Sequence, residues 1–185
     1  MKRAGHLMER IAHPDNLSEA FLRAARGKWH SHEVQRFAAC VTDELKRMAD
    51  ELLGGSYRFG QYHLFTVYDP KKRTICAAPF RDRVAMHAIM RICHPVFDDF
   101  QTNDSFASRK GRGQYAALER TQGYARRFPW FAKMDMRKYF DSIDHKVMMA
   151  QLARLFKDRQ LLLYFCDIMD GYETTAGKGL PIGVE

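Results

Sequence analysis

The first third of the chain places apolar residues at the three- and four-residue spacing of amphipathic helices. This spacing predicts one helix that starts at Asn16 or Ser18 and runs through His30. It also predicts a longer helix that opens at Ser31–Glu33 and ends at Gly54–Gly55, because glycine readily adopts the conformation that closes a helix. We therefore expect residues 1–55 to form a helical region.

The pattern changes to alternation after this region. Side chains alternate from Tyr62 to Tyr68, an Asp-Pro pair follows, and a second β-rich run ends before Pro79. Such an arrangement predicts a β-hairpin, with the cations of residues 71–73 at its tip. Three adjacent cations on a turn can bind an anion, or they can be an ordinary solvated turn.

Helical spacing resumes after the hairpin. One helix is expected from Phe80 toward Phe97, where Pro95 should end or kink it, and another from Gln114 to Arg127. The run from Trp130 to Met136 is expected to be a short strand with an acid at its end.

The remainder of the chain is again expected to be helical. We expect Asp141 to cap a helix over 142–156, with Asp144 in its first turn, and a last helix over 159–171. Methionines 134, 136, 148 and 149 are expected in the core.

Basic residues concentrate in the middle of a chain whose formal net charge is +8. Residues 71–128 hold 12 Lys and Arg against 5 acidic residues, whereas residues 1–70 hold 10 against 9 and residues 129–185 hold 8 against 8. A local excess of this kind is typical of a surface that binds polyanions, because cations set against phosphates release condensed counterions. The alternative is a solvated basic face that binds nothing.

The sequence carries no signal for a membrane or for an oxidising compartment. No stretch approaches the roughly 18 uninterrupted apolar residues of a membrane span, and the first residues lack the apolar core of a secretory signal. The four cysteines are widely separated and include no Cys-x-x-Cys pair, so we expect buried, reduced thiols. These features predict a cytoplasmic protein with no membrane partner.

Asp135 is the acid at the end of the expected strand. A carboxylate at that place is unfavourable if it is buried without a partner. It therefore either meets a cation within the fold or coordinates a metal ion, and the spacing alone leaves both readings open.

The chain contains four short blocks in a fixed order. They are Tyr68–Ile75 with Pro79–Val84, then Ser105–Gly113, Lys133–His145 and Gly179–Gly183. In this order they resemble the first two thirds of the reverse transcriptases of bacterial type, which occur in group II introns, retrons and diversity-generating retroelements. The resemblance implies an α+β fold: a helical N-terminal region over 1–55, β-hairpin fingers over 56–128, and the first part of a right-hand polymerase palm over 129–185.

The resemblance also implies roles for individual residues of an RNA-directed DNA polymerase. Asp135 would be the catalytic, metal-binding aspartate that holds Mg²⁺, and two such ions drive nucleotidyl transfer. Lys71 and Arg73 would bind the triphosphate of the incoming deoxynucleotide, and Phe140 would exclude a 2′-hydroxyl beneath the sugar. The residues expected to contact the RNA template and the DNA or RNA primer are Arg81, Arg83, Arg109, Lys110, Arg112, Gly179, Pro181, Ile182 and Gly183.

The sequence departs from the family pattern in two ways. Ile182 stands where many relatives carry Gln, which resembles the diversity-generating retroelement branch. No Tyr-x-Asp-Asp motif occurs in the 185 residues, and the Asp98-Asp99 pair precedes the first palm aspartate. We therefore expect a fingers and partial-palm fragment, truncated before that turn and inactive in nucleotidyl transfer when alone.

Two other readings remain open at this stage. One is a non-catalytic RNA-binding module derived from the fingers. The other is a structural piece that self-associates through a cut palm, since an incomplete sheet exposes edges and apolar surface.

Overall fold

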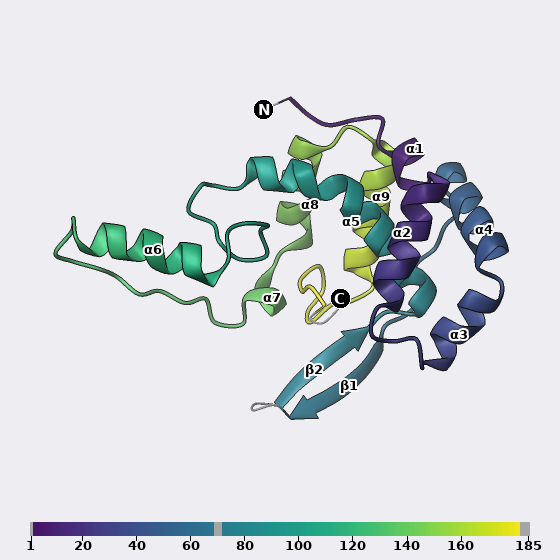
Figure 1. Ribbon diagram of the computed structural model, residues 1–185, viewed down its shortest axis with the longest axis horizontal. Coiled ribbons are helices and arrows are strands. Elements are labelled where there is room, and N and C mark those ends of the chain that lie inside the picture. The colour runs from purple at the N-terminus through teal and green to yellow at the C-terminus, as the bar shows by residue number, and fades with distance from the viewer. Residues whose placement is uncertain (1, 69–71, 182–185) are drawn as a thin grey trace. The chain divides into compact units, whose positions relative to one another are not determined.

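The computed structural model of the protein describes residues 2–68 and 72–181. The chain divides into two compact units, one of Met1–His94 with Lys138–Glu185 and one of Pro95–Arg137. The described residues are mostly helical, with one two-stranded antiparallel sheet (Figure 1). The predicted boundaries between the N-terminal region, the fingers and the palm, at residues 56 and 129, remain predictions. The compact units reflect internal packing and do not test these boundaries.

Four helices form the first third of the chain: α1 (Met8–Ile11), α2 (Pro14–Ala25), α3 (His32–Ala39) and α4 (Val41–Gly54). The longer predicted helix is thus two helices that break at Cys40, and Gly55 closes the second with a left-handed φ of 73°. Helix α2 starts earlier than predicted, because the ring of His13 accepts a hydrogen bond from the Asp15 amide and Pro14 takes the first helical position.

Asn16, predicted as a cap, instead fastens three helices together. It is buried, and its amide nitrogen donates to the carbonyl of Ile11 at 2.8 Å and to that of Ala88 at 3.1 Å. Its carbonyl oxygen accepts from Arg91 Nε at 3.1 Å. A buried amide with these partners is satisfied, so it adds specificity to the apolar packing around it.

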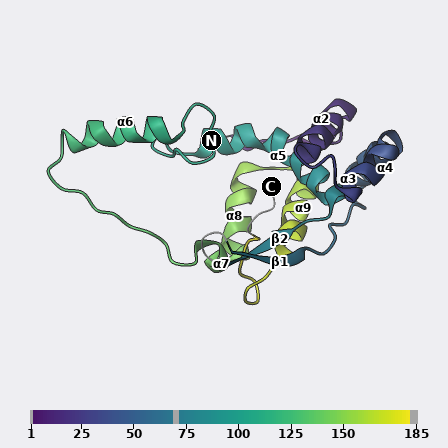
Figure 2. The same ribbon diagram turned by 60° about the horizontal axis from the view of Figure 1, so that its bottom comes forward.

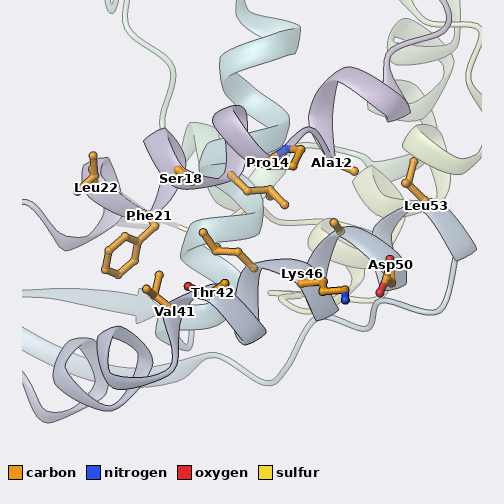
Figure 3. A pocket seen from close by; sticks show the side chains of 13 residues that line it. Ala12, Pro14, Ser18, Phe21, Leu22, Val41, Thr42, Lys46, Asp50 and Leu53 are labelled. Carbon is orange, nitrogen blue, oxygen red and sulfur yellow. The ribbon is translucent and has the colours of Figure 1, made fainter.

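Aromatic rings fill the core between these helices and the next one. Phe21 stacks on Phe37 with centroids 5.5 Å apart, and both meet the edge of Phe80, at 6.1 and 5.3 Å. Helix α2 and helix α4 also leave between them an open apolar groove of about 680 Å³, lined by Leu22 and Leu53 among others (Figure 3).

The hairpin prediction is confirmed. Strands β1 (His63–Tyr68) and β2 (Lys72–Ala77) pair antiparallel, with His63 opposite Ala77 and Tyr68 opposite Lys72. Helix α5 (Phe80–Phe100) follows, and it continues past Pro95, which it contains. The division between the two compact units falls directly before that proline.

Three helices complete the first unit: α7 (Tyr139–Ser142), α8 (His145–Leu155) and α9 (Arg159–Asp170). Asp144, not Asp141, caps α8, since its carboxylate accepts from the amides of Lys146 and Val147 at 2.9 and 3.1 Å. Both views place α8 beside α9 (Figures 1 and 2).

The N-terminal segment joins the connection between α8 and α9. The Ala4 amide donates to the Leu155 carbonyl at 2.8 Å, and the Lys157 amide donates to the Ala4 carbonyl at 2.7 Å. The Asp158 carboxylate accepts from the amides of His6 and Leu7 at 3.0 and 3.2 Å. The beginning of the chain is thereby fixed to residues that follow it by about 150 positions.

The second unit has a single complete helix, α6 (Gln114–Ala125), and an extended tail. The predicted strand over 130–136 is wrong: these residues form no strand, and Trp130 and Phe131 are 88% and 93% exposed. A strand needs a neighbour to pair with, and no described strand lies alongside it. Met134 and Met136 are accordingly exposed rather than in the core.

None of the described helices has the length and hydropathy that a membrane crossing requires.

Candidate nucleotide and nucleic-acid site

The hairpin is the element predicted to hold a triphosphate. Its strands are largely exposed, with Leu64 and Tyr68 at 55% and 75%. The backbone of Arg73 lies in β2 opposite Val67, and Lys72 beside it is exposed. Lys71 lies outside the described residues, so its predicted role is not addressed.

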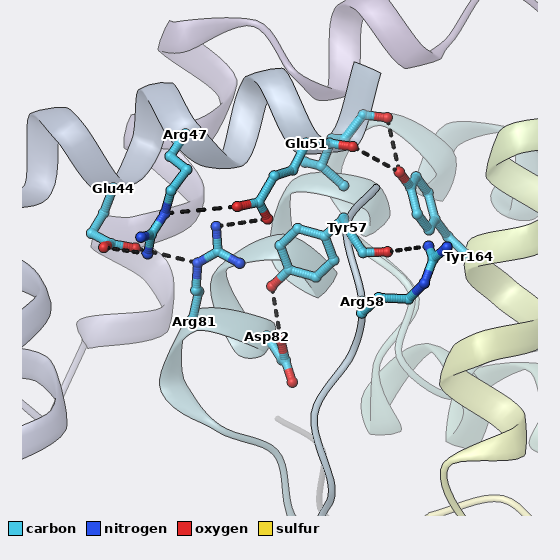
Figure 4. A network of polar contacts seen from close by, with 9 residues as sticks. Glu44, Arg47, Glu51, Tyr57, Arg58, Arg81, Asp82 and Tyr164 are labelled. Atoms are coloured by element: carbon cyan, nitrogen blue, oxygen red, sulfur yellow. Dashed lines mark hydrogen bonds and ion pairs between the residues drawn. The ribbon is translucent and has the colours of Figure 1, made fainter. Parts of the chain in front are cut away.

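The base of the hairpin is anchored by a buried carboxylate that the sequence reasoning missed (Figure 4). Asp82, which is 4% exposed, accepts hydrogen bonds from the Tyr57 hydroxyl at 2.8 Å and from the Gly60 amide at 2.7 Å. Burial raises the pKa of Asp82, and the two hydrogen bonds work against that rise. Burial, with the negative charge of Asp82, also raises the pKa of Tyr57.

Arg81, one of the residues predicted to bind nucleic acid, is engaged within the same network. Its guanidinium donates to Glu44 at 3.2 Å and to Glu51 at 2.9 Å, and it lies 4.9 Å from the centroid of the Tyr57 ring (Figure 4). Tyr164 of α9 donates to the carbonyl of Leu52 at 2.9 Å. These contacts tie α4, the hairpin base, α5 and α9 together.

Arg83 is also paired internally. It contacts Glu33 at 3.1 Å, its guanidinium lies 5.4 Å from the centroid of the Phe80 ring, and its side chain is 15% exposed. The role of Arg81 and Arg83 in binding nucleic acid remains a prediction. Their ion pairs with glutamates do not favour it, because these contacts already neutralise the two guanidinium groups.

The loop before α6 holds the next three predicted residues. Arg109 is 10% exposed and donates to the Asp98 carboxylate at 2.9 Å and to the carbonyls of Thr102 and Ser105 at 2.8 and 3.3 Å. Arg112 binds the carbonyl of Asn103. Lys110 between them is exposed. The two arginines therefore shape the loop, and Lys110 is the cation that it presents to solvent.

Asp135, the predicted metal ligand, lies in the exposed tail of the second unit. Its carboxylate accepts a hydrogen bond from the next amide, that of Met136, at 3.0 Å. The expected burial at a strand end is therefore absent from the described structure.

Two of the four sequence blocks meet in the first unit. The Leu180 amide donates to the Phe140 carbonyl at 3.0 Å, and the Gly179 amide donates to the Ile143 carbonyl at 2.9 Å. Phe140 is 44% exposed and meets the Tyr139 ring at 5.4 Å. A phenyl ring that remains this exposed is not a fully buried core residue, which leaves it able to contact a ligand.

Gly179 is required by this junction. Its φ is +118°, and a Cβ on it would lie 2.9 Å from the Thr174 amide nitrogen. Pro181 follows and is half-buried, whereas Ile182 and Gly183 lie outside the described residues.

Several known proteins are similar to the chain at low sequence identity. No family model matches the chain. Protein YkfC of Escherichia coli (strain K12) is 28% identical over 203 residues, with 98% of this chain and 52% of YkfC covered. Nuclear intron maturase 1, mitochondrial, of Arabidopsis thaliana is 29% identical over 83 residues, with 45% of this chain and 12% of that protein covered.

A solved structure extends the similarity to the fold. The partial Cas6-RT-Cas1–Cas2 complex aligns with a TM-score of 0.61 and 19% identity over 96% of this chain and 32% of that one. The chain is reverse-transcriptase-like. This reverse-transcriptase-like chain spans about half the length of YkfC and about an eighth of the maturase.

Proposed function

We propose that the chain supplies the fingers and the first part of the palm of an RNA-directed DNA polymerase. The observation that carries the proposal is the junction of Phe140 with the 179–181 block, where two motifs far apart in sequence are joined by backbone hydrogen bonds. The intron maturase relative and the fold similarity support it.

In this proposal, Asp135 provides a carboxylate for Mg²⁺, which stabilises the charge that develops on the transferred phosphate. The residues fit only in part, because Asp135 is one exposed carboxylate and a two-ion site needs more. The 185 residues hold no Tyr-x-Asp-Asp motif to add them. We therefore expect this chain to bind its ligands without extending a primer on poly(rA) with Mg²⁺ and dTTP. Incorporation that Asp135→Asn abolishes would contradict that expectation.

The proposed sugar selection can be tested by binding. Phe140 would exclude a 2′-hydroxyl, so Phe140→Ala should bring the affinities for dATP and ATP closer together in the presence of Mg²⁺, while Asp135→Asn should weaken both. The measurement is competition against a fluorescent deoxynucleotide. Tyr139→Ala, in the neighbouring exposed ring, is the matched control. An unchanged dATP-to-ATP ratio in Phe140→Ala would contradict the proposed gate.

Nucleic-acid binding is the part of the proposal that the chain can show directly. We expect a fluorescent RNA–DNA primer-template to bind at least 10-fold more weakly when salt rises from about 50 to about 200 mM. Lys110→Ala should lower the logarithmic salt slope by about 0.7 to 0.9, because one phosphate contact is lost. Lys46→Ala, an exposed lysine of α4, should leave the slope unchanged. Binding with no salt dependence would reduce the basic segment to a solvated face.

The alternative function is RNA binding without catalysis. The observation that favours it is the exposure of Asp135, because RNA binding needs no metal-holding carboxylate. It predicts the same salt dependence but no effect of Asp135→Asn on nucleotide affinity, so the competition measurement separates the two functions.

A further inference from the structure

One cluster of ligand-type side chains contains none of the residues that were predicted to bind nucleotide, metal or nucleic acid. His145 at the start of α8, Asp170 at the end of α9 and Glu173 in the following turn bring one nitrogen and two carboxylate oxygens within 4.8 Å of one another. The three residues belong to the same compact unit.

The ring of His145 is held in one tautomer. Its Nε2 lies 2.7 Å from the Gly179 carbonyl, which can only accept a hydrogen bond, so Nε2 must carry the proton. In a neutral ring the lone pair is then on Nδ1. Metal-binding histidines almost always donate their second ring N–H in this way, because the hydrogen bond fixes the orientation of the ring.

The lone-pair nitrogen has no hydrogen-bond partner among the described residues. His145 is 6% exposed, and Nδ1 is fully buried without a hydrogen bond. The Asp170 Oδ1 atom lies 3.3 Å away, but the two atoms form no hydrogen bond. A buried lone pair that faces a carboxylate oxygen is unfavourable unless a proton or a metal cation lies between the two atoms.

The separation of the two atoms fits a shared metal ion. Metal–ligand bonds of about 2.0 to 2.1 Å at a tetrahedral zinc ion place neighbouring ligand atoms about 3.3 Å apart. The separation between Nδ1 and Oδ1 is 3.3 Å.

The surrounding contacts position the two carboxylates. Asp170 Oδ2 accepts from the Cys166 thiol at 3.2 Å, so Oδ1 remains directed at the ring. Glu173 accepts from the Gly177 amide at 2.9 Å.

We propose that His145, Asp170 and Glu173 bind a transition-metal ion, with Zn²⁺ the preferred one. An imidazole with two carboxylates suits Zn²⁺ better than Mg²⁺, which favours oxygen ligands and retains its waters. The ion joins the start of α8 to the end of α9. Through the bond from His145 to Gly179, it also stiffens the turn that leads into the 179–181 block. This proposal does not depend on polymerase activity.

The test is a calorimetric titration of the untagged, chelator-treated chain with ZnCl₂ near neutral pH, with millimolar Mg²⁺ present throughout. We expect one ion per chain. Asp170→Asn and Glu173→Gln should each weaken binding by at least about 10-fold, as even outer-shell changes at metal sites do. Both residues are exposed, so neither variant threatens the fold. Asp167→Asn, one turn earlier on α9, should change the affinity by less than about twofold.

Two further measurements exclude other binding sites. A chain with Cys40→Ser and Cys166→Ser should keep its Zn²⁺ affinity, because neither thiol is a proposed ligand. Zn²⁺ should also slow amide exchange over 177–180 in the wild type and not in Glu173→Gln. Zn²⁺ binding that survives both carboxylate substitutions, or a failure to bind at millimolar Zn²⁺, would overturn the proposal. In the second case, the three side chains form a structural cluster that binds no metal ion.

Discussion

The two compact units treat their apolar side chains in opposite ways. Helix α2 of the first unit buries six residues, whereas α6 of the second buries none. Trp130 and Phe131 of the second unit stand almost fully in solvent. Apolar side chains are therefore buried only where other elements of the structure pack against them. In the first unit, helices from both ends of the sequence pack on one another. The second unit has one complete helix, a loop and an extended tail.

Amide hydrogen exchange offers the widest test of this contrast. We expect amides of 128–137 to exchange at least about 1000-fold faster than those at the centre of α9, because the tail makes no described ladder bonds while α9 opens only with the core. The measurement is exchange mass spectrometry on the 185-residue chain. Equal protection of the two segments would contradict the difference in packing between the two units.

A pair of matched leucines tests the same contrast by stability. Leu161 of α9 is fully buried, and Leu118 of α6 is 50% exposed. Leu161→Ala should lower the free energy of unfolding by about 2 to 5 kcal/mol, since it leaves a cavity in a packed core. Leu118→Ala should change it by less than about 0.5 kcal/mol. Urea denaturation followed by circular dichroism gives both values, and similar losses would show a second core around α6.

Arg109 offers a test within the second unit. It makes hydrogen bonds to Asp98, Thr102 and Ser105 in the loop before α6. Arg109→Ala should lower the local opening energy of residues 98–112 by about 1 to 3 kcal/mol, because a charged group with several acceptors is lost. Arg126→Ala, at an exposed position just after α6, is the control. The readout is exchange of the loop amides, and an unchanged loop in Arg109→Ala would show that other contacts order it.

The sequence predicted the elements of the first unit well, because their apolar faces are buried against one another. The hairpin, α5 and α9 lie within a few residues of their expected bounds. Helix α6 of the second unit does so as well, although it buries no residue, so its bounds follow from local helical spacing rather than from packing. The strand at 130–136 could not be judged from its own residues, because a strand depends on a partner elsewhere in the chain. Aspartate is a common helix cap, so both Asp141 and Asp144 were candidates. Asp141 lies within the short helix α7 and Ile143 is extended, so the next helix begins after Asp144, which caps it.

The candidate site was less predictable than the fold. The charge of Arg81 and Arg83 suggested contacts with phosphates. In the structure they pair with Glu44, Glu51 and Glu33, which lie far away in sequence, so the residues next to the arginines do not indicate this pairing. The cluster around His145 was missed for the same reason, since its carboxylates follow by 25 and 28 residues. His145 starts α8 and Asp170 ends α9, and only the packing of these two helices brings the side chains together. No short sequence motif indicates such a pair.

The attachment of the N-terminal segment to the α8–α9 connection sets an order for synthesis. The Leu7 amide binds the Asp158 carboxylate, 151 positions later in the chain. This bond cannot form until the ribosome has added the residues between them. At about 5 to 20 residues per second, that wait lasts about 8 to 30 seconds. Helices α2 to α4 can pack on one another during this time, whereas the amides of His6 and Leu7 still lack the Asp158 carboxylate that they bind. Residues 4–7 are made about 150 residues before their partners and are therefore among the last of these residues to become native.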